Sequence, residues 1–205
     1  MTQRMHELAA EIVRLQVELD REIHKRRDQL GFRLHAGLVE FASDVTVEHR
    51  RLRVGVAQFM AQAQLGTVLS APLIYSLIVP FIVIDAWVSL YQAICFRVYA
   101  IQQVRRADFI SLDRRHLTYL NSIEALNCMF CGYGNGVIAD VREVAGRTEQ
   151  YWCPIKHAMR VADPHLRYYE FLEYGDAAGY RSRLDAFRER LRAAAPADGA
   201  APPAS

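Results

Sequence analysis

The feature that most constrains this chain is an apolar run in its middle, from Val54 to Phe96, that contains no lysine or arginine. Its only formal charge is Asp85, and residues 68–84 carry no charge at all. About 20 consecutive apolar residues suffice for a helix to cross the hydrocarbon layer of a bilayer. The sequence therefore predicts a membrane segment over residues 54–98.

Two membrane arrangements of this segment are open, and a buried hairpin in a soluble protein is a third. The first is a single span over residues 68–90, and the second is a helical hairpin that turns near Ser70–Pro72. Arginines precede the run and also follow it. Basic flanks favour the cytoplasmic side, so the hairpin is preferred, with both termini in the cytoplasm at a bacterial inner membrane. The hairpin arms are residues 54–69 and 73–98.

Asp85 is the one charge in this segment, and it has two interpretations. A carboxylate inside hydrocarbon costs a few kcal/mol and often serves transport. The preferred interpretation places Asp85 at the end of a span, close to Trp87, where water hydrates it.

Helical periodicity predicts amphipathic helices over residues 1–53. Apolar residues recur there every three or four positions, as on one face of a helix: Leu8, Ile12, Leu15, Leu19 and Ile23. This pattern fits a short coiled coil or a helix that packs on its own chain. The apolar pattern continues over residues 32–41 towards the membrane segment.

Residues 99–192 are expected to form a small helical domain in the cytosol. Asp113 is a plausible N-cap for a helix that continues to Asn127, and Asp163-Pro164 begins a helix that ends at Gly175. A further helix is expected over residues 180–194, packed through Leu184, Phe187 and Leu191. No clear strand pattern is present, so the predicted fold class is all-α. Residues 193–205, rich in Ala and Pro, are expected to be a disordered tail.

A candidate metal site lies in the C-terminal half. Cys128-Met-Phe-Cys131 is followed by glycines at 132, 134 and 136, which can supply the tight turn of a zinc knuckle. Farther along, Cys153-Pro154 is followed by His157, and a helix that begins at Pro154 would place Cys153 and His157 on one face. If Gly146 ends the intervening helix, the chain can return to the knuckle. Cys128, Cys131, Cys153 and His157 are therefore the predicted ligands.

Three thiolates and one imidazole complete a tetrahedral site, so the metal is expected to be structural. Zinc is preferred, and iron is the less favoured metal. Two further alternatives remain open: a thiol redox pair at Cys128 and Cys131, and buried cysteines without any ligand.

The runs Asn127-Cys128-Met-Phe-Cys131-Gly and Tyr151-Trp-Cys153-Pro-Ile-Lys-His157-Ala resemble a set of uncharacterised bacterial membrane-associated proteins. The resemblance covers residues 119–176 and implies no activity. The knuckle followed by a helix-borne ligand pair also resembles a treble-clef or zinc-ribbon variant, with a helical connection where those folds have a β-hairpin.

The functional expectation is a membrane-anchored, zinc-binding interaction or assembly module, and the alternative is a thiol or iron redox protein at the membrane. No P-loop, dinucleotide fingerprint, G-x-S-x-G or H-E-x-x-H motif occurs, which favours a role without catalysis. A net charge of +2 gives no strong field for nucleic acid. The expected partners are the lipid bilayer and a protein, either another protein or a second copy of this chain.

Overall fold

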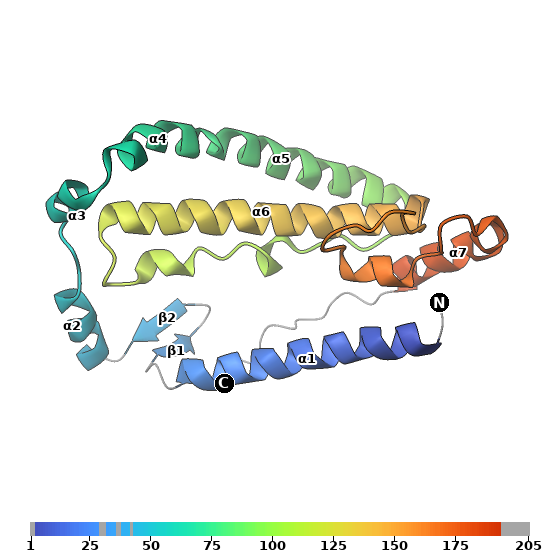
Figure 1. The fold of residues 1–205 in the computed structure, drawn as a ribbon, viewed down its shortest axis with the longest axis horizontal. Coiled ribbons are helices and arrows are strands. Elements are labelled where there is room, and N and C mark those ends of the chain that lie inside the picture. The colour runs from blue at the N-terminus through green and yellow to red at the C-terminus, as the bar shows by residue number, and fades with distance from the viewer. Residues whose placement is uncertain (1–2, 29–31, 36–37, 42, 194–205) are drawn as a thin grey trace. The chain divides into compact units, whose positions relative to one another are not determined.

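The computed structural model describes residues 3–28, 32–35, 38–41 and 43–193, and these are mainly helical, as predicted (Figure 1). They divide into two compact units. The apolar-helix unit contains the described residues of 25–87 and 105–140, and the C-terminal unit contains those of 1–24, 88–104 and 141–200. The predicted tail lies outside the described residues, except for Ala193.

The N-terminal region begins with helix α1 (Gln3–Asp28), which confirms the helical periodicity. Two short antiparallel strands follow, β1 (Phe32–His35) and β2 (Leu38–Phe41), where a helical pattern was predicted. The helical interpretation of this stretch is wrong because apolar and polar residues alternate in Phe32-Arg33-Leu34-His35, a period that suits a strand. Helices α2 (Ser43–Arg51) and α3 (Val56–Gln62) complete the region.

From Leu65 onward the apolar run forms one long helix rather than a hairpin, and its first part, residues 56–62, is the separate helix α3, joined to the long helix through extended backbone at Ala63 and Gln64. Helix α4 (Leu65–Ser76), helix α5 (Ile78–Tyr91) and the π-helical turn η1 (Gln92–Phe96) follow one another without a reversal. The predicted turn near Pro72 is wrong, because Pro72 lies inside α4. An interior proline removes one N–H from the helical ladder and crowds the carbonyl four residues earlier, but here the helix continues through it.

The segment before the next long helix contains two short 3-10 turns, η2 (Arg106–Asp108) and η3 (Asp113–His116). The helix predicted from Asp113 is therefore wrong at its start. The long helix α6 begins at Ser122 instead, because Asn121 is the better cap. Its Oδ1 accepts the N–H groups of Ile123 and Glu124, each at 3.0 Å, and Glu124 Oε2 accepts the N–H of Asn121 at 2.9 Å. This reciprocal pattern is a capping box.

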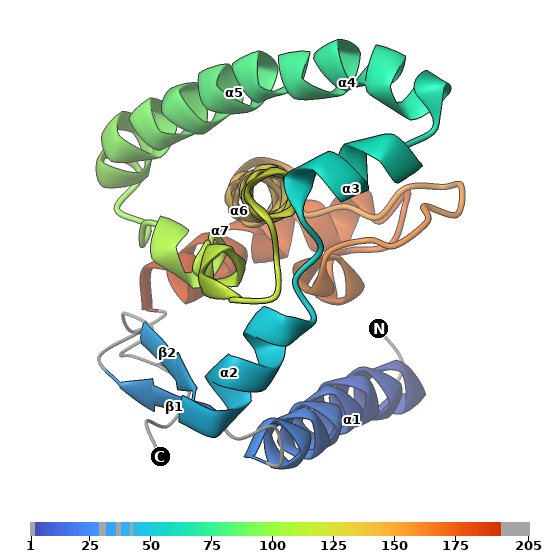
Figure 2. The ribbon, with the colours of Figure 1, turned by 90° about the vertical axis from the view of Figure 1, so that its left-hand side faces the viewer.

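Helix α6 (Ser122–Trp152) runs without a break through the glycines that were predicted to form a knuckle and a helix end. Packing explains this correction. A Cβ atom on Gly134 would lie 2.8 Å from the Phe81 ring, and one on Gly136 would lie 2.8 Å from the carbonyl oxygen of Phe109. The glycines thus allow close approach on two sides of α6. Figure 2 views α6 along its axis, with α4–α5 on one side and the segment with the 3-10 turns on the other.

In the C-terminal unit, the chain after α6 is held by a short backbone ladder. Lys156 N–H donates to the carbonyl of Leu172 at 2.7 Å, and Leu172 N–H donates to that of Pro154 at 2.9 Å. Pro154 therefore lies in an extended segment, and the helix predicted to begin there is wrong. The 3-10 helix η4 (Leu166–Glu170) replaces most of the helix predicted to end at Gly175.

Helix α7 (Ala177–Ala193) confirms the last predicted helix. Its Phe187 is buried with Phe171 and Leu172, and Leu191 is also buried, so the apolar stripe packs on its own protein as expected.

Candidate functional site

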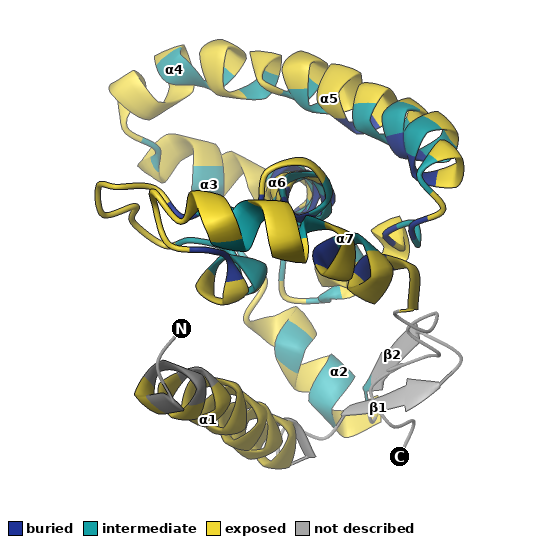
Figure 3. Cartoon of the chain, turned by 90° about the vertical axis from the view of Figure 1, so that its right-hand side faces the viewer, coloured by how far each residue is buried: buried dark blue, intermediate teal, exposed yellow. Residues whose placement is uncertain are grey.

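The outer face of α4–α5 is apolar and exposed over its whole length. Leu73 is 76% exposed and Trp87 is 71% exposed, and the most apolar stretch of this helix has no buried residue. Figure 3 shows exposed residues along the outer side of both helices. By length and composition, Leu65–Phe96 is the one helix among the described residues that could cross a membrane. Further outer residues more than half exposed are Leu65, Leu69, Val79, Ile82 and Val83.

The inner face of the same helix is partly or fully buried and carries its polar groups. These residues recur every three or four positions: Ala71, Tyr75, Ile78, Phe81 and Asp85. The Tyr75 hydroxyl donates to Oδ1 of Asn127 on α6. Phe81 and Phe130 pack ring against ring, with centroids 6.3 Å apart. The helix therefore has an exposed outer face and a packed inner face, although its sequence is apolar all round.

Asp85 is buried and paired rather than hydrated, which corrects the preferred sequence interpretation. It is 9% exposed, and Arg106 donates to both of its oxygens, from Nε at 2.8 Å and from Nη2 at 2.6 Å. The Tyr133 hydroxyl donates to Oδ2 at 2.7 Å. This bidentate ion pair with a third donor satisfies the carboxylate within the protein. No charge is then left on the outer face of α4–α5.

Electrostatics around Asp85 keep the pair charged. The hydrogen bonds from the Arg106 guanidinium to Asp85 raise the pKa of Arg106 above its ordinary value. Burial, followed by the hydrogen bond to Asp85, raises the pKa of Tyr133, so that its hydroxyl stays protonated and donates. The sequence could have indicated Arg106 as a basic residue near the apolar run, but it held no signal for Tyr133.

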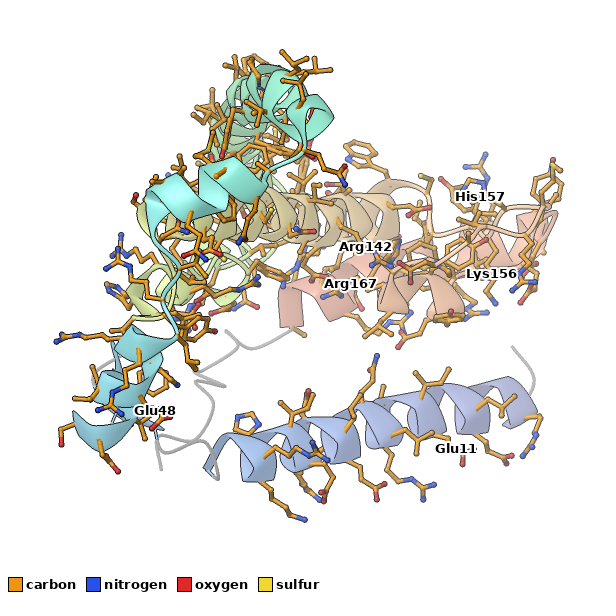
Figure 4. All side chains as sticks on the ribbon, turned by 60° about the vertical axis from the view of Figure 1, so that its left-hand side comes forward. Glu11, Glu48, Arg142, Lys156, His157 and Arg167 are labelled. Atoms are coloured by element: carbon orange, nitrogen blue, oxygen red, sulfur yellow. The ribbon has the colours of Figure 1, made fainter. Side chains whose placement is uncertain are left out.

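The structure does not bring the four predicted metal ligands together. Cys128 and Cys131 lie one turn apart within α6, Cys153 follows the end of that helix, and His157 lies in the loop beyond it (Figure 4). Helix α6 continues from Cys131 to Trp152, so the turn and the returning chain that the predicted site needs between Cys131 and Cys153 are absent. Among the described residues, no three His, Cys, Asp or Glu side chains are placed to hold a metal ion.

The surroundings of the predicted ligands can be described one by one. None of the four cysteines forms a disulfide. Burial, and then the charge of Glu149, raises the pKa of the Cys153 thiol, which disfavours a reactive thiolate there. The His157 ring stacks on Tyr168, with centroids 6.0 Å apart. Zinc binding by this set stays a prediction of the sequence.

The C-terminal unit contains a network of charged side chains that was not predicted from the sequence. Glu143 Oε1 accepts hydrogen bonds from Arg147 Nε and Arg167 Nη2, both at 2.8 Å. Burial alone would raise the pKa of Glu143, but the hydrogen bonds from Arg167 and Arg147 hold that pKa below its ordinary value. Nearby, His165 Nε2 lies 2.8 Å from Glu149 Oε2. The network ties α6 to the chain that follows it.

No protein-family model, curated protein or solved structure matches this chain. In the described part of the chain, the fold and these contacts define a mainly helical protein in which one long apolar helix has an exposed outer face and an inner face that holds its Asp85–Arg106 pair.

Proposed function

We propose that this chain is a membrane-anchored interaction or assembly module, in which α4–α5 binds the bilayer and the C-terminal unit contacts a protein partner. The observation that supports the proposal best is the uncovered outer face of the helix Leu65–Phe96. Burying one large apolar side chain contributes about 1.5–3 kcal/mol. Several such side chains entering lipid together would hold the protein at a membrane.

The position of Asp85 supports the same role. A charge facing lipid would oppose insertion, but Asp85 is on the inner face and is paired with Arg106. Tyr75, Phe81 and Asp85 all contact residues of the same unit on that face. Length and composition fit a helix that spans the bilayer, whereas the protein contacts of the inner face favour a helix that enters lipid only with its outer face.

An interfacial helix is also consistent with the basic residues on both of its flanks. Arg53 precedes the apolar run and Arg97 follows it. If the helix does not cross the bilayer, both flanks and both termini stay on one side, which we propose to be the cytoplasmic side of a bacterial inner membrane. Structural zinc held by Cys128, Cys131, Cys153 and His157 remains part of the proposal. With α6 unbroken, one ion would have to join ligands from two copies of the chain.

Flotation with vesicles of phosphatidylcholine tests the anchor. The double variant Leu73→Asp, Val83→Asp places two charges on the outer face, each of which opposes entry into lipid by up to about 3 kcal/mol. We expect the wild-type protein to float with the vesicles and the variant to bind at least about 100-fold more weakly.

The matched control is Leu15→Asp, Leu19→Asp on α1, whose leucines are also exposed. This control should float like the wild type. A wild-type protein that stays with the soluble fraction, or an α4–α5 variant that floats equally well, would show that the outer face is not a membrane anchor.

A further inference from the structure

A basic hollow lies in the apolar-helix unit at the N-terminal end of α6. Its volume is about 480 Å³, within the range of small-molecule sites. Arg50 at the end of α2, Arg53 just after it, and Arg115 and His116 of η3 contribute to its wall. No Asp or Glu is among the described residues that line it. The wall therefore gathers positive charge from segments far apart in the sequence.

The three arginines have no ion pair with any acidic residue in the described parts of the chain. Arg115 Nε donates to Nε2 of His116 at 3.1 Å, which holds these two side chains next to each other. Neighbouring guanidinium groups repel one another unless an anion lies between them. A phosphate group is the anion that such planar donors bind best, because each can donate two parallel hydrogen bonds.

The start of α6 adds two unpartnered polar groups to the same wall. Oδ1 of Asn121 is used by the capping box, which fixes the orientation of the amide. Its Nδ2 is buried, and among the described residues it has no partner, in a side chain that is 1% exposed. Thr118 Oγ1, which also lines the hollow, is likewise buried without a partner. A buried donor without a partner is costly, and a bound acceptor would satisfy it.

We infer that this hollow binds a phosphate group, either that of an anionic lipid headgroup or that of a soluble phosphate compound. The arginines supply positive charge and the buried Asn121 amide supplies a donor, whereas the first N–H groups of α6 are already used by its capping box. The lipid source rests on the proposed membrane anchoring, whereas the soluble source does not.

The test uses the full chain purified in detergent. Binding of inorganic phosphate and pyrophosphate is measured by calorimetry, and binding of phosphatidic acid by flotation with mixed vesicles, at low ionic strength. Asn121→Asp is the sharpest variant, because Asp caps a helix as well as Asn does but replaces the donor with a negative oxygen. We expect about tenfold weaker binding or more, with helix content unchanged. The double variant Arg53→Gln, Arg115→Gln should weaken binding by a similar factor.

Arg51→Gln, Arg105→Gln is the matched control, because it removes the same charge from the same unit outside the hollow. Saturable binding of phosphate or pyrophosphate that only the hollow variants weaken assigns a soluble ligand. A loss confined to phosphatidic acid vesicles, with flotation on phosphatidylcholine unchanged, assigns a lipid headgroup. Equal losses in the control, or no binding in either arm, would overturn the inference. Flotation on phosphatidylcholine reports the apolar anchor separately.

Discussion

The two halves of helix α6 differ in the contacts that they make: one half packs against apolar groups, and the other carries ion pairs. The first half, in the apolar-helix unit, has glycines where the Phe81 ring and the Phe109 backbone approach, and its Tyr133 donates to the buried carboxylate of Asp85. The second half, in the C-terminal unit, carries Glu143 and Glu149 with their arginine and histidine partners. A single helix thus packs against the apolar helix with one half and carries a charged network on the other.

Removing the carboxylate of Asp85 should have the largest effect on stability. Asp85→Ala leaves Arg106 and Tyr133 without their acceptor. The Arg106 side chain is 46% exposed and can turn to water, so the loss is smaller than for a fully buried pair. Urea unfolding in detergent should show a loss of about 2–3 kcal/mol in the free energy of unfolding. The control Asp108→Ala breaks the exposed pair with Arg105 and should cost less than about 1 kcal/mol. Equal losses would mean that Asp85 is no more important than a surface charge.

Adding a methyl group to the glycines tests whether the two halves of α6 differ in packing. Gly136→Ala places a Cβ 2.8 Å from the carbonyl oxygen of Phe109, and backbone yields less readily than a side chain. We expect a loss of about 2 kcal/mol in unfolding free energy despite the better helix propensity of alanine. Gly146→Ala meets only the His165 ring, at 3.2 Å, and should change stability by less than about 1 kcal/mol. A reversed order would contradict the comparison.

The pH dependence of the second half follows from Glu143. Because its pKa is lowered in the folded protein, Glu143 contributes stability that is fully present above its ordinary value of 4.5 and is lost as the pH falls through the lower folded value. Glu143→Gln should remove about 1–2 kcal/mol at pH 7 and less below pH 4. Urea unfolding at both pH values measures this difference. A constant difference between wild type and variant would show that Glu143 is not the titrating group.

Several features could be predicted from local sequence alone. The periodic stripes of α1 and α7 and the uncharged run of α4–α5 specify helices because each element's own residues have helical spacing. The cap at Asn121 could also have been found, since Glu124 completes its capping box. Asp113 is also a good cap residue, but the 3-10 helix η3 that begins there ends after four residues.

What the sequence by itself determined is therefore the helical class and the apolar segment, both of which follow from patterns within a few turns of chain. Tertiary structure decided the rest. Gly132, Gly134 and Gly136 would weaken an isolated helix, and they stay helical because other segments pack where side chains would be. Asp85 accepts hydrogen bonds from Arg106 and Tyr133, which lie 21 and 48 residues farther along the chain. Such contacts depend on how separate segments pack together, and a local pattern of residues does not predict that packing.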